Sequence, residues 1–354
     1  MKAVLVTGGT TPLGIQLARA LLDLRLAGEV LCAGAEPAEQ IAPLLAGSKV
    51  RYLRCDLTRS RSLREMLFGP VAESGVEAVV HLATHRLARE DGESVHALNV
   101  ETLHDLLHLC ERVPTLRRFV YRSFAEVYRV RHQEPSLMGE DHPLETSPDA
   151  PQWLRDRVEA DREVCSALGV SPLRIFILRC AECFAPGMGS QLWDYTRSGI
   201  CFRPLGFDPM LNLASLDDLV RAHLCALAAA EQGVYNVPGL DTLPLTEAVA
   251  LSGQISVPVP GPLLAPLYAL RRYARGFDFR YDLARVRFHL GGVLDGTRAQ
   301  RKLGYRPRAG VQWRASGEKP GLVLRAPHDG EDMPFMPAPE AAQPGDAAKE
   351  QRLP

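Results

Sequence analysis

The segment VTGGTTPLG, residues 6–14, sets the fold class of this chain. It follows the apolar segment 2–6, whose length and composition predict a short buried strand, and it precedes residues 13–26, whose apolar positions recur with helical spacing. A strand, a glycine-rich turn and a helix in this order are typical of the first unit of a dinucleotide-binding domain. Gly8 and Gly14 take the first and third glycine positions of that turn.

The turn offers several groups to a bound phosphate. Thr11 stands in place of the middle glycine, where a side chain crowds the backbone but its hydroxyl can bond a phosphate oxygen. The helix that begins near Pro12 offers free amides and the positive end of its dipole. We therefore expect a nucleotide here, and the alternative is a loop that keeps the fold without binding one. The expected contacts are Gly8, Thr10, Thr11, Pro12, Leu13 and Gly14.

The end of the second predicted strand bears on the choice of cofactor. Residues 31–36 read LCAGAE, so no carboxylate stands near Ala33 or Gly34, where one usually holds the adenosine ribose. Glu36, two or three residues further on, is expected to take that role. No arginine stands there for a 2′-phosphate, which favours NAD over NADP. Asp56, after the third strand, suits either the adenine amino group or a helix cap.

Strand and helix patterns alternate along the first two thirds of the chain. This alternation predicts an α/β fold, a Rossmann-type doubly wound parallel sheet with mostly apolar strands buried on both faces. The expected strands are 2–6, 29–33, 50–54, 76–82, 117–122 and 173–179, and the expected helices are 13–26, 36–46, 60–68, 93–112, 151–168 and 216–230.

The chain is expected to divide into two domains and a tail. Residues 1–185 are predicted to form the dinucleotide-binding Rossmann domain, to which the chain returns around 211–240. Residues 186–316 are expected to form mainly a smaller substrate-type α/β domain. The last segment, 317–354, has seven prolines, no periodicity and a net charge of −3, which predicts a disordered tail.

Composition excludes several classes of protein. The formal net charge of −1 argues against a specific nucleic-acid binder. The apolar runs are too short and too interrupted to predict a span across a membrane. The eight cysteines are scattered, which suits free thiols in a reducing cytoplasm. Cys180 and Cys183 form a CxxC pair without a second pair to complete a zinc site, so we expect no bound metal.

The order of several short motifs is informative beyond the first turn. They are TGGTTPLG at 7–14, Cys55-Asp56-Leu57, His81-Leu82-Ala83, Asn99-Val100, Glu140-Asp141-His142-Pro143-Leu144, Leu178-Arg179, Leu216-Asp217-Asp218, Tyr235-Asn236-Val237 and Leu303-Gly304-Tyr305-Arg306-Pro307. In this order and spacing, roughly residues 1–310 resemble the extended short-chain dehydrogenase/reductase family, of the NAD-dependent nucleotide-sugar epimerase/dehydratase type.

The resemblance implies a Rossmann domain with a smaller C-terminal substrate domain, a nucleotide or nucleotide-sugar ligand, and often a homodimer built on two helix pairs. It further implies that the segment of Asp56 and Leu57 contacts the adenine. Leu82 and Ala83 are implied to lie beside the nicotinamide ribose.

The resemblance also locates the family's catalytic residues, which are Ser or Thr, Tyr and Lys. The first position, four residues before Tyr128, holds Phe124. The family's Y-x-x-x-K pair falls on Trp153 and Arg157. No lysine lies between Lys49 and Lys302, so no shift of the alignment restores one. Arginine stays protonated and cannot titrate as an acid–base group, although Arg157 can still hold a ribose or a phosphate.

We therefore predict a catalytically degenerate member that binds a nucleotide and acts as a regulatory or assembly protein, as a homodimer or with a partner protein. The first alternative is an active epimerase, dehydratase or reductase that uses Glu126 or His85. The second is a protein that docks on a partner or a membrane through residues 261–308. There, the apolar run 261–270 precedes a segment, 271–308, with eleven basic and three acidic residues.

Overall fold

The computed structural model describes residues 1–45, 49–88, 90–275 and 279–313. The tail predicted for 317–354 lies outside the described residues. Within them, the centre of the fold is a seven-stranded sheet whose neighbouring strands are all parallel, which confirms the predicted fold class. In spatial order the strands are β11 (Gly233–Val237), β7 (Arg174–Cys180), β5 (Arg118–Phe124), β4 (Val76–His81), β1 (Ala3–Thr7), β2 (Glu29–Gly34) and β3 (Val50–Arg54).

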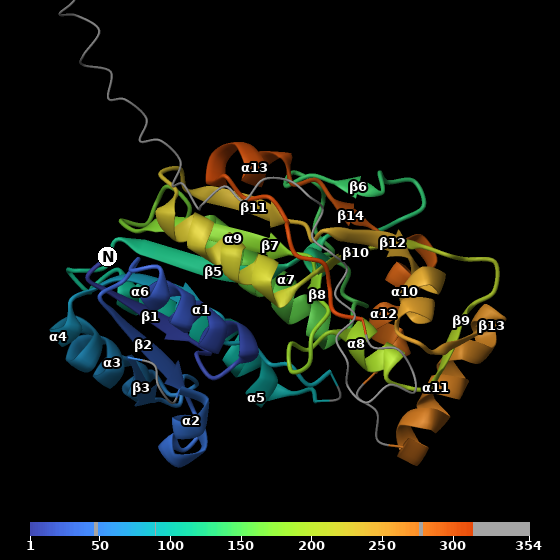
Figure 1. The fold of residues 1–354 in the computed structure, drawn as a ribbon, viewed down its shortest axis with the longest axis horizontal. Helices are drawn as coiled ribbons and strands as arrows, with labels where there is room; N and C mark the ends of the chain where they lie inside the picture. The colour runs from blue at the N-terminus through green and yellow to red at the C-terminus, as the bar shows by residue number, and fades with distance from the viewer. Residues whose placement is uncertain (46–48, 89, 276–278, 314–354) are drawn as a thin grey trace, which may run out of the picture.

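Helices cover both faces of this sheet (Figure 1). On one face, Leu13 and Leu17 of α1 and Leu219 and Ala222 of α9 pack against Val4 and the other inward residues of the strands. On the other face, α3, α6 and α7 enclose a second apolar core. The helices of this part of the molecule are α1 (Pro12–Asp23), α2 (Ala38–Leu45), α3 (Ser60–Met66), α4 (Ala72–Ser74), α5 (Glu93–His96), α6 (Thr102–Cys110), α7 (Gln152–Ser166), α9 (Leu216–Ala228) and α13 (Thr297–Leu303).

Two predicted helices are interrupted by wider turns. The helix predicted over 60–68 is α3, followed by a π-type turn, Leu67–Val71, and by α4. Gly69 in this turn leaves helical geometry, because the following Pro70 disfavours the helical conformation in the residue before it. The helix predicted over 93–112 contains a π-type turn at Ala97–Glu101, between α5 and α6.

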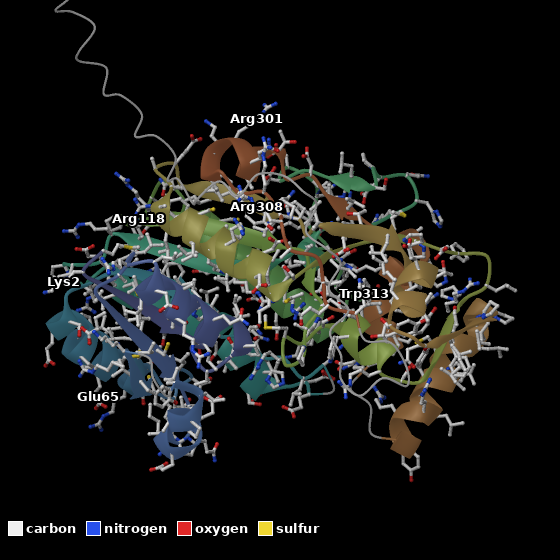
Figure 2. The ribbon with its side chains drawn as sticks, viewed as in Figure 1. Lys2, Glu65, Arg118, Arg301, Arg308 and Trp313 are labelled. Atoms are coloured by element: carbon white, nitrogen blue, oxygen red, sulfur yellow. The ribbon has the colours of Figure 1, made fainter. Side chains whose placement is uncertain are left out.

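A smaller layer lies beyond the carboxyl ends of the central strands (Figure 1). Its core is aromatic and includes Tyr195, Tyr268, Phe279 and Phe288, and Trp313 packs against this cluster near the end of the described chain (Figure 2). The strands outside the central sheet are β6 (Leu137–Met138), β8 (Glu182–Cys183), β9 (Ile200–Pro204), β10 (Met210–Ala214), β12 (Asp241–Pro244), β13 (Ile255–Val259) and β14 (Val293–Leu294). The helices are α8 (Gln191–Thr196), α10 (Leu245–Leu251), α11 (Gly261–Arg275) and α12 (Tyr281–Leu290). No helix among the described residues is long and apolar enough to cross a membrane.

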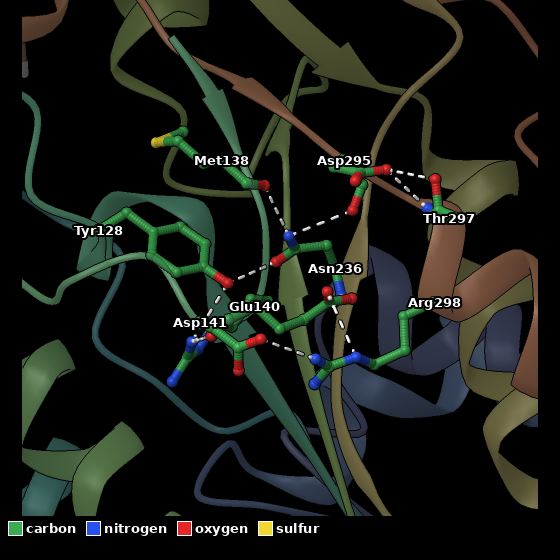
Figure 3. Close-up of polar contacts among 9 residues, drawn as sticks. Tyr128, Met138, Glu140, Asp141, Asn236, Asp295, Thr297 and Arg298 are labelled. Carbon is green, nitrogen blue, oxygen red and sulfur yellow. Dashed lines mark hydrogen bonds and ion pairs between the residues drawn. The ribbon is translucent and has the colours of Figure 1, made fainter. Parts of the chain in front are cut away.

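Asn236 of β11 joins three distant segments of the chain (Figure 3). Its side-chain oxygen accepts from the Tyr128 hydroxyl at 2.6 Å, and its amide nitrogen donates to the carbonyl of Met138 at 2.8 Å. Its backbone N–H donates to the Glu140 carboxylate at 2.9 Å. Tyr128 is therefore a buried structural residue.

Asp218 of α9 holds the last described segment against the sheet. Its buried carboxylate accepts hydrogen bonds from the backbone amides of Arg308 and Ala309, at 2.8 and 3.2 Å. Burial raises the pKa of Asp218 to about 6, although these two hydrogen bonds act in the opposite direction. The folded state therefore binds a proton at this site more tightly than the unfolded chain, whose aspartates titrate near about 3.9.

We expect this proton to make stability depend on pH. Since the pKa is raised on folding, the contribution of Asp218 is most favourable below about pH 4 and falls by about 2–3 kcal/mol as the pH rises through about 6. The measurement is the free energy of unfolding by urea at several pH values, for the native chain and for Asp218→Asn. The difference between the two should change over this window, and a constant difference would contradict the assignment.

Candidate functional site

The first turn requires a glycine at its start. Gly8 has φ +66°, in the left-handed region, and a Cβ there would lie 2.7 Å from the backbone nitrogen of Ala83. A Cβ on Gly14 would lie 2.5 Å from the carbonyl oxygen of Gly8. The two glycines thus let the turn pack directly on the end of β4 and let α1 begin directly over it.

The hydroxyl of Thr11 already has two partners inside the turn. It accepts from the backbone amide of Gly14 at 3.0 Å, as the N-cap of α1, and it donates to the carbonyl of Gly8 at 2.8 Å. This corrects the expectation that the hydroxyl is free to donate to a phosphate. Within the described part of the chain, the amides of Thr10 and Leu13 donate to no protein acceptor, so they are the donors that the turn offers to an anion.

Two charged side chains lie beside this turn. The Glu36 carboxylate accepts from the Thr10 hydroxyl at 3.0 Å, which places it at the mouth of the turn, where the sequence expected it. Arg86, in the loop after β4, donates to the carbonyl of Gly187 at 2.6 Å, and Gly187 itself lies against Pro12. Burial lowers the pKa of Arg86, and the charge of Glu36 raises it. The sequence analysis missed Arg86, because only the fold brings the loop after β4 to the start of α1.

The other residues expected at the cofactor are placed along the same edge of the sheet. Asp56 closes the turn before α3, because its carboxylate accepts from the backbone amide of Thr58 at 3.1 Å and from its hydroxyl at 2.7 Å. Leu57 and Leu82 are buried, and Ala83 is half-buried against Gly8. The assignment of these residues to adenine and ribose stays a prediction.

The three residues predicted to stand at the family's catalytic positions come together in one stack. Phe124 is the last residue of β5, and Trp153 and Arg157 lie one turn apart on α7. The guanidinium carbon of Arg157 lies 3.9 Å from the centre of the Phe124 ring and 3.9 Å from that of Trp153. All three side chains are buried. A cation held between two aromatic faces is a stabilising arrangement, so these residues fill the position with a packed unit.

The charge of Arg157 is balanced by Glu126, with which it forms an ion pair. Burial lowers the pKa of Arg157, and the nearby charge of Arg122 acts in the same direction. Because an arginine pKa starts above about 12, and because a carboxylate and two ring faces stabilise the cation, the group stays charged at neutral pH. Glu126, a candidate acid–base residue in the sequence, is thereby engaged with Arg157.

Ser123 does not replace the missing hydroxyl. It points to the opposite face of β5 from Phe124, as its place in the strand predicts, and donates to the buried Asp161 at 2.5 Å. Asp161 also forms two hydrogen bonds with the guanidinium of Arg179, at 2.6 and 3.0 Å. This buried network belongs to the packing of α7 on the sheet.

His85, the other candidate base, lies beside Glu90. Its Nε2 lies 3.1 Å from the Glu90 carboxylate, and its backbone amide donates to Asn99 at 2.8 Å. The Asn99 side chain also accepts from the Thr84 hydroxyl at 3.1 Å. The loop after β4 is therefore held by Asn99, and the structure gives His85 a partner within that loop.

A cavity of about 610 Å³ adjoins the stack. It lies between the start of α7, β10 and α12, and Glu126 and Trp153 reach its wall from the side of the stack. Among the described residues, the buried Nη2 of Arg287 and the buried side-chain nitrogen of Gln191 have no hydrogen-bond partner, although both residues line the cavity. Burial lowers the pKa of Arg287, and the charge of Glu182 raises it. These unpaired donors suit a ligand with negatively charged or carbonyl oxygens.

Three basic residues of the segment 271–308 form ion pairs with acidic side chains. Arg280 pairs with Asp91 and Asp282, both at distances of 3.1 Å or less. In the same segment, Arg298 pairs with Glu140 and Asp141, and Lys302 pairs with Glu231. These ion pairs involve three of the basic residues, and docking of the segment on a partner or a membrane stays a prediction.

The apolar run before it forms the helix α11. Leu263, Leu270 and Tyr273 are exposed along it, at 53%, 67% and 92%. Its role in docking stays a prediction.

Comparisons with known proteins agree with this architecture. Residues 4–197 match the sequence model of the NAD dependent epimerase/dehydratase family. An uncharacterized protein of Mycobacterium tuberculosis strain H37Rv is 30% identical over 319 residues, which cover 87% of this chain and 80% of that protein. An uncharacterized protein of Mycobacterium bovis matches with the same figures.

Solved structures of similar fold are nucleotide-sugar enzymes. A dTDP-glucose 4,6-dehydratase from Streptomyces venezuelae, with NAD bound, superposes with a TM-score of 0.65 at 21% identity, over 87% of this chain and 92% of that one. A UDP-glucuronic acid 4-epimerase from Bacillus cereus, in complex with UDP-glucuronic acid and NAD, superposes with a TM-score of 0.64 at 17% identity, over 87% and 95%. At these identities the likeness establishes the fold.

Proposed function

Because this chain belongs to the NAD dependent epimerase/dehydratase family, we propose that it binds a dinucleotide and a sugar-nucleotide-type ligand without performing the family's acid–base chemistry. It would act as a regulatory or assembly protein that responds to these ligands, alone or as the homodimer that the family resemblance implies. The observation that carries the proposal is the stack of Phe124, Arg157 and Trp153 in place of a hydroxyl, a lysine and a tyrosine.

The residues of the first turn fit a dinucleotide. Gly8 lets the turn pack closely on the end of β4, and the amides of Thr10 and Leu13 are free to receive a pyrophosphate at the start of α1. Glu36 would accept from a ribose hydroxyl, and Arg86 would neutralise phosphate charge. With a carboxylate rather than an arginine next to the turn at the end of β2, NAD is favoured over NADP. When bound, NAD supplies a hydride acceptor.

The adjoining cavity supports the second ligand. Its volume of about 610 Å³ is within the range of small-molecule sites, and the unpaired nitrogens of Arg287 and Gln191 are suited to phosphate or sugar oxygens. The similar enzymes from Streptomyces venezuelae and Bacillus cereus act on nucleotide sugars, which makes this class of ligand the first to test.

The side chains near the stack decide whether acid–base catalysis can occur. Acid–base catalysis needs a group that can gain and lose a proton within hydrogen-bond reach of the substrate. Phe124 cannot hydrogen-bond, Trp153 can only donate, and Arg157 does not titrate near neutral pH. Glu126 would have to leave its ion pair with Arg157 before it could accept a proton. His85 would likewise have to leave its contact with Glu90. These engagements favour the degenerate interpretation over an active enzyme.

The test separates binding from turnover. The purified chain should bind NAD in isothermal titration calorimetry, yet convert no nucleotide sugar such as UDP-glucuronic acid to a new product in chromatography and mass spectrometry. Gly14→Val should abolish the binding of NAD, since even a Cβ would lie 2.5 Å from the carbonyl of Gly8, and Arg86→Ala should weaken it about tenfold. Gly139→Ala is the matched control, because a Cβ there meets nothing within 4 Å.

Two outcomes would overturn the proposal. Turnover that Glu126→Gln or His85→Ala abolishes would establish an active enzyme with unusual catalytic residues. An absence of any NAD or NADP binding by the native chain would show that the turn keeps only the fold.

A further inference from the structure

A histidine pair lies on the surface of α6 and shares no residue with the candidate site. His104 and His108 are four residues apart on α6, and their ring centres lie 4.5 Å apart at an interplanar angle of 73°. Residues at this spacing share one face of a helix, one turn apart. Two such histidines on one face are the arrangement by which helices offer two nitrogens to a single metal ion.

A third donor reaches the pair from another helix. A carboxylate oxygen of Glu163, on α7, lies within hydrogen-bond distance of Nδ1 of His104, at 2.8 Å. The two helices are held together below this surface, because Leu103 and Leu107 of α6 belong to the same apolar core as Ala160 of α7. One potential ligand atom from each of His104, His108 and Glu163 lies within 4.8 Å of the others.

We propose that His104, His108 and Glu163 form a binding site for a divalent cation of the zinc class, which links α6 to α7. Two imidazole nitrogens and one carboxylate oxygen are a ligand set that zinc accepts, with a fourth position left to water. Magnesium and calcium favour sites built from oxygen alone, so the two nitrogens select against them.

The distances can be reached without moving the backbone. Nitrogen and oxygen ligands lie about 2.0–2.2 Å from zinc, so in a tetrahedron they lie about 3.3–3.6 Å from one another. Nδ1 of His104 and the Glu163 carboxylate, at 2.8 Å, must separate slightly, and donors as far apart as 4.8 Å must approach by about 1 Å. Rotation of the side chains allows this, since those of His104, His108 and Glu163 are 53%, 58% and 33% exposed.

A second carboxylate lies beside the ring of His108. Glu111, one turn after His108, lies 3.6 Å from Nδ1 of that ring. Metal-bound histidines commonly direct the ring nitrogen that does not bind the metal toward a carboxylate, which orients the ring and strengthens the other nitrogen as a ligand. Glu111 thus leaves Nε2 of His108 for the cation and adds negative charge near it.

A bound ion would stabilise the contact between α6 and α7 at this surface. Without it, His104 and Glu163 are joined by one exposed ion pair, which contributes little to stability. With it, three side chains from two helices share one centre, and any affinity for the folded state adds to the stability of the fold by mass action. The site is independent of the proposed nucleotide binding and shares no residue with it.

The experiment uses the full chain without a histidine tag. Isothermal titration with ZnCl₂ should show one ion bound per chain in the micromolar range, and Co²⁺ should give the visible absorption bands of a four-coordinate site. His104→Ala, His108→Ala and Glu163→Gln should each weaken zinc binding at least tenfold and remove the rise in melting temperature that zinc causes. His289→Ala, on α12, is the matched control and should change neither.

Three results would overturn the proposal. One is zinc affinity that survives the double variant His104→Ala, His108→Ala, which would assign the ion to the free thiols or to another surface. Another is a six-coordinate Co²⁺ spectrum that is the same in all variants. The last is the absence of zinc binding by the native chain at micromolar concentration. Circular dichroism of each variant establishes that it is folded before the comparison is made.

Discussion

Asp161→Asn is expected to destabilise the fold by about 3–5 kcal/mol, because it removes the charge that a buried arginine needs. Arg179 is 4% exposed and Asp161 is 0% exposed, and the two side chains share two hydrogen bonds, at 2.6 and 3.0 Å. Burial alone would lower the pKa of Arg179, but its hydrogen bonds and ion pair with Asp161 raise it above its usual value. The guanidinium therefore stays charged and would be left without its counter-charge.

Denaturation by urea, followed by circular dichroism, measures this effect. Arg179→Met should cost a similar amount, since it leaves the Asp161 carboxylate buried and unpaired. The double variant Asp161→Asn, Arg179→Met should lose clearly less than the sum of the two single variants, because it leaves no buried charge without a partner. Strict additivity would show that the two groups do not depend on each other.

Arg157→Leu is expected to cost about 2–4 kcal/mol of stability and to leave catalysis at its existing level. The guanidinium lies between the rings of Phe124 and Trp153 and neutralises Glu126, so its loss separates the rings from their cation and leaves a half-buried carboxylate. The readouts are urea denaturation and the conversion of a nucleotide sugar, followed by chromatography.

Two further variants give the controls. Arg157→Leu combined with Glu126→Leu should recover part of the lost stability, because the unpaired carboxylate is gone. Arg157→Lys places a lysine where the family carries one, and it should still show no turnover, since Phe124 and Trp153 remain. Turnover that appears with this single change would show that the stack is not what prevents catalysis.

The local arrangement of the first turn could be predicted in large part. Gly8 and Gly14 are required by contacts with their neighbours in sequence and with the end of β4, and the motif contains both. The opposite faces of Ser123 and Phe124 follow from the period of a strand. Thr11 is different, because whether its hydroxyl is free depends on the cap that it forms once α1 has started.

The partners of charged side chains were harder to predict from the sequence. The eleven basic residues of 271–308 suggested one surface, but their acidic partners, such as Asp91 and Glu140, lie far away along the chain. Arg86 was missed at the candidate cofactor site for the same reason. The pair His104 and His108 is visible as H-x-x-x-H, whereas Glu163 joins it from 55 residues beyond His108.

The sequence by itself determined the parallel α/β fold and the family, and it predicted the replacement of the three catalytic residues. Each of these depends on residue type and on short spacings, which the order of the chain contains. The tertiary structure decided what the replacements form, because a strand end and a helix must meet before Phe124 and Trp153 can enclose Arg157. It also decided which carboxylate neutralises each buried arginine, since charge pairing depends on distances in space that no local pattern records.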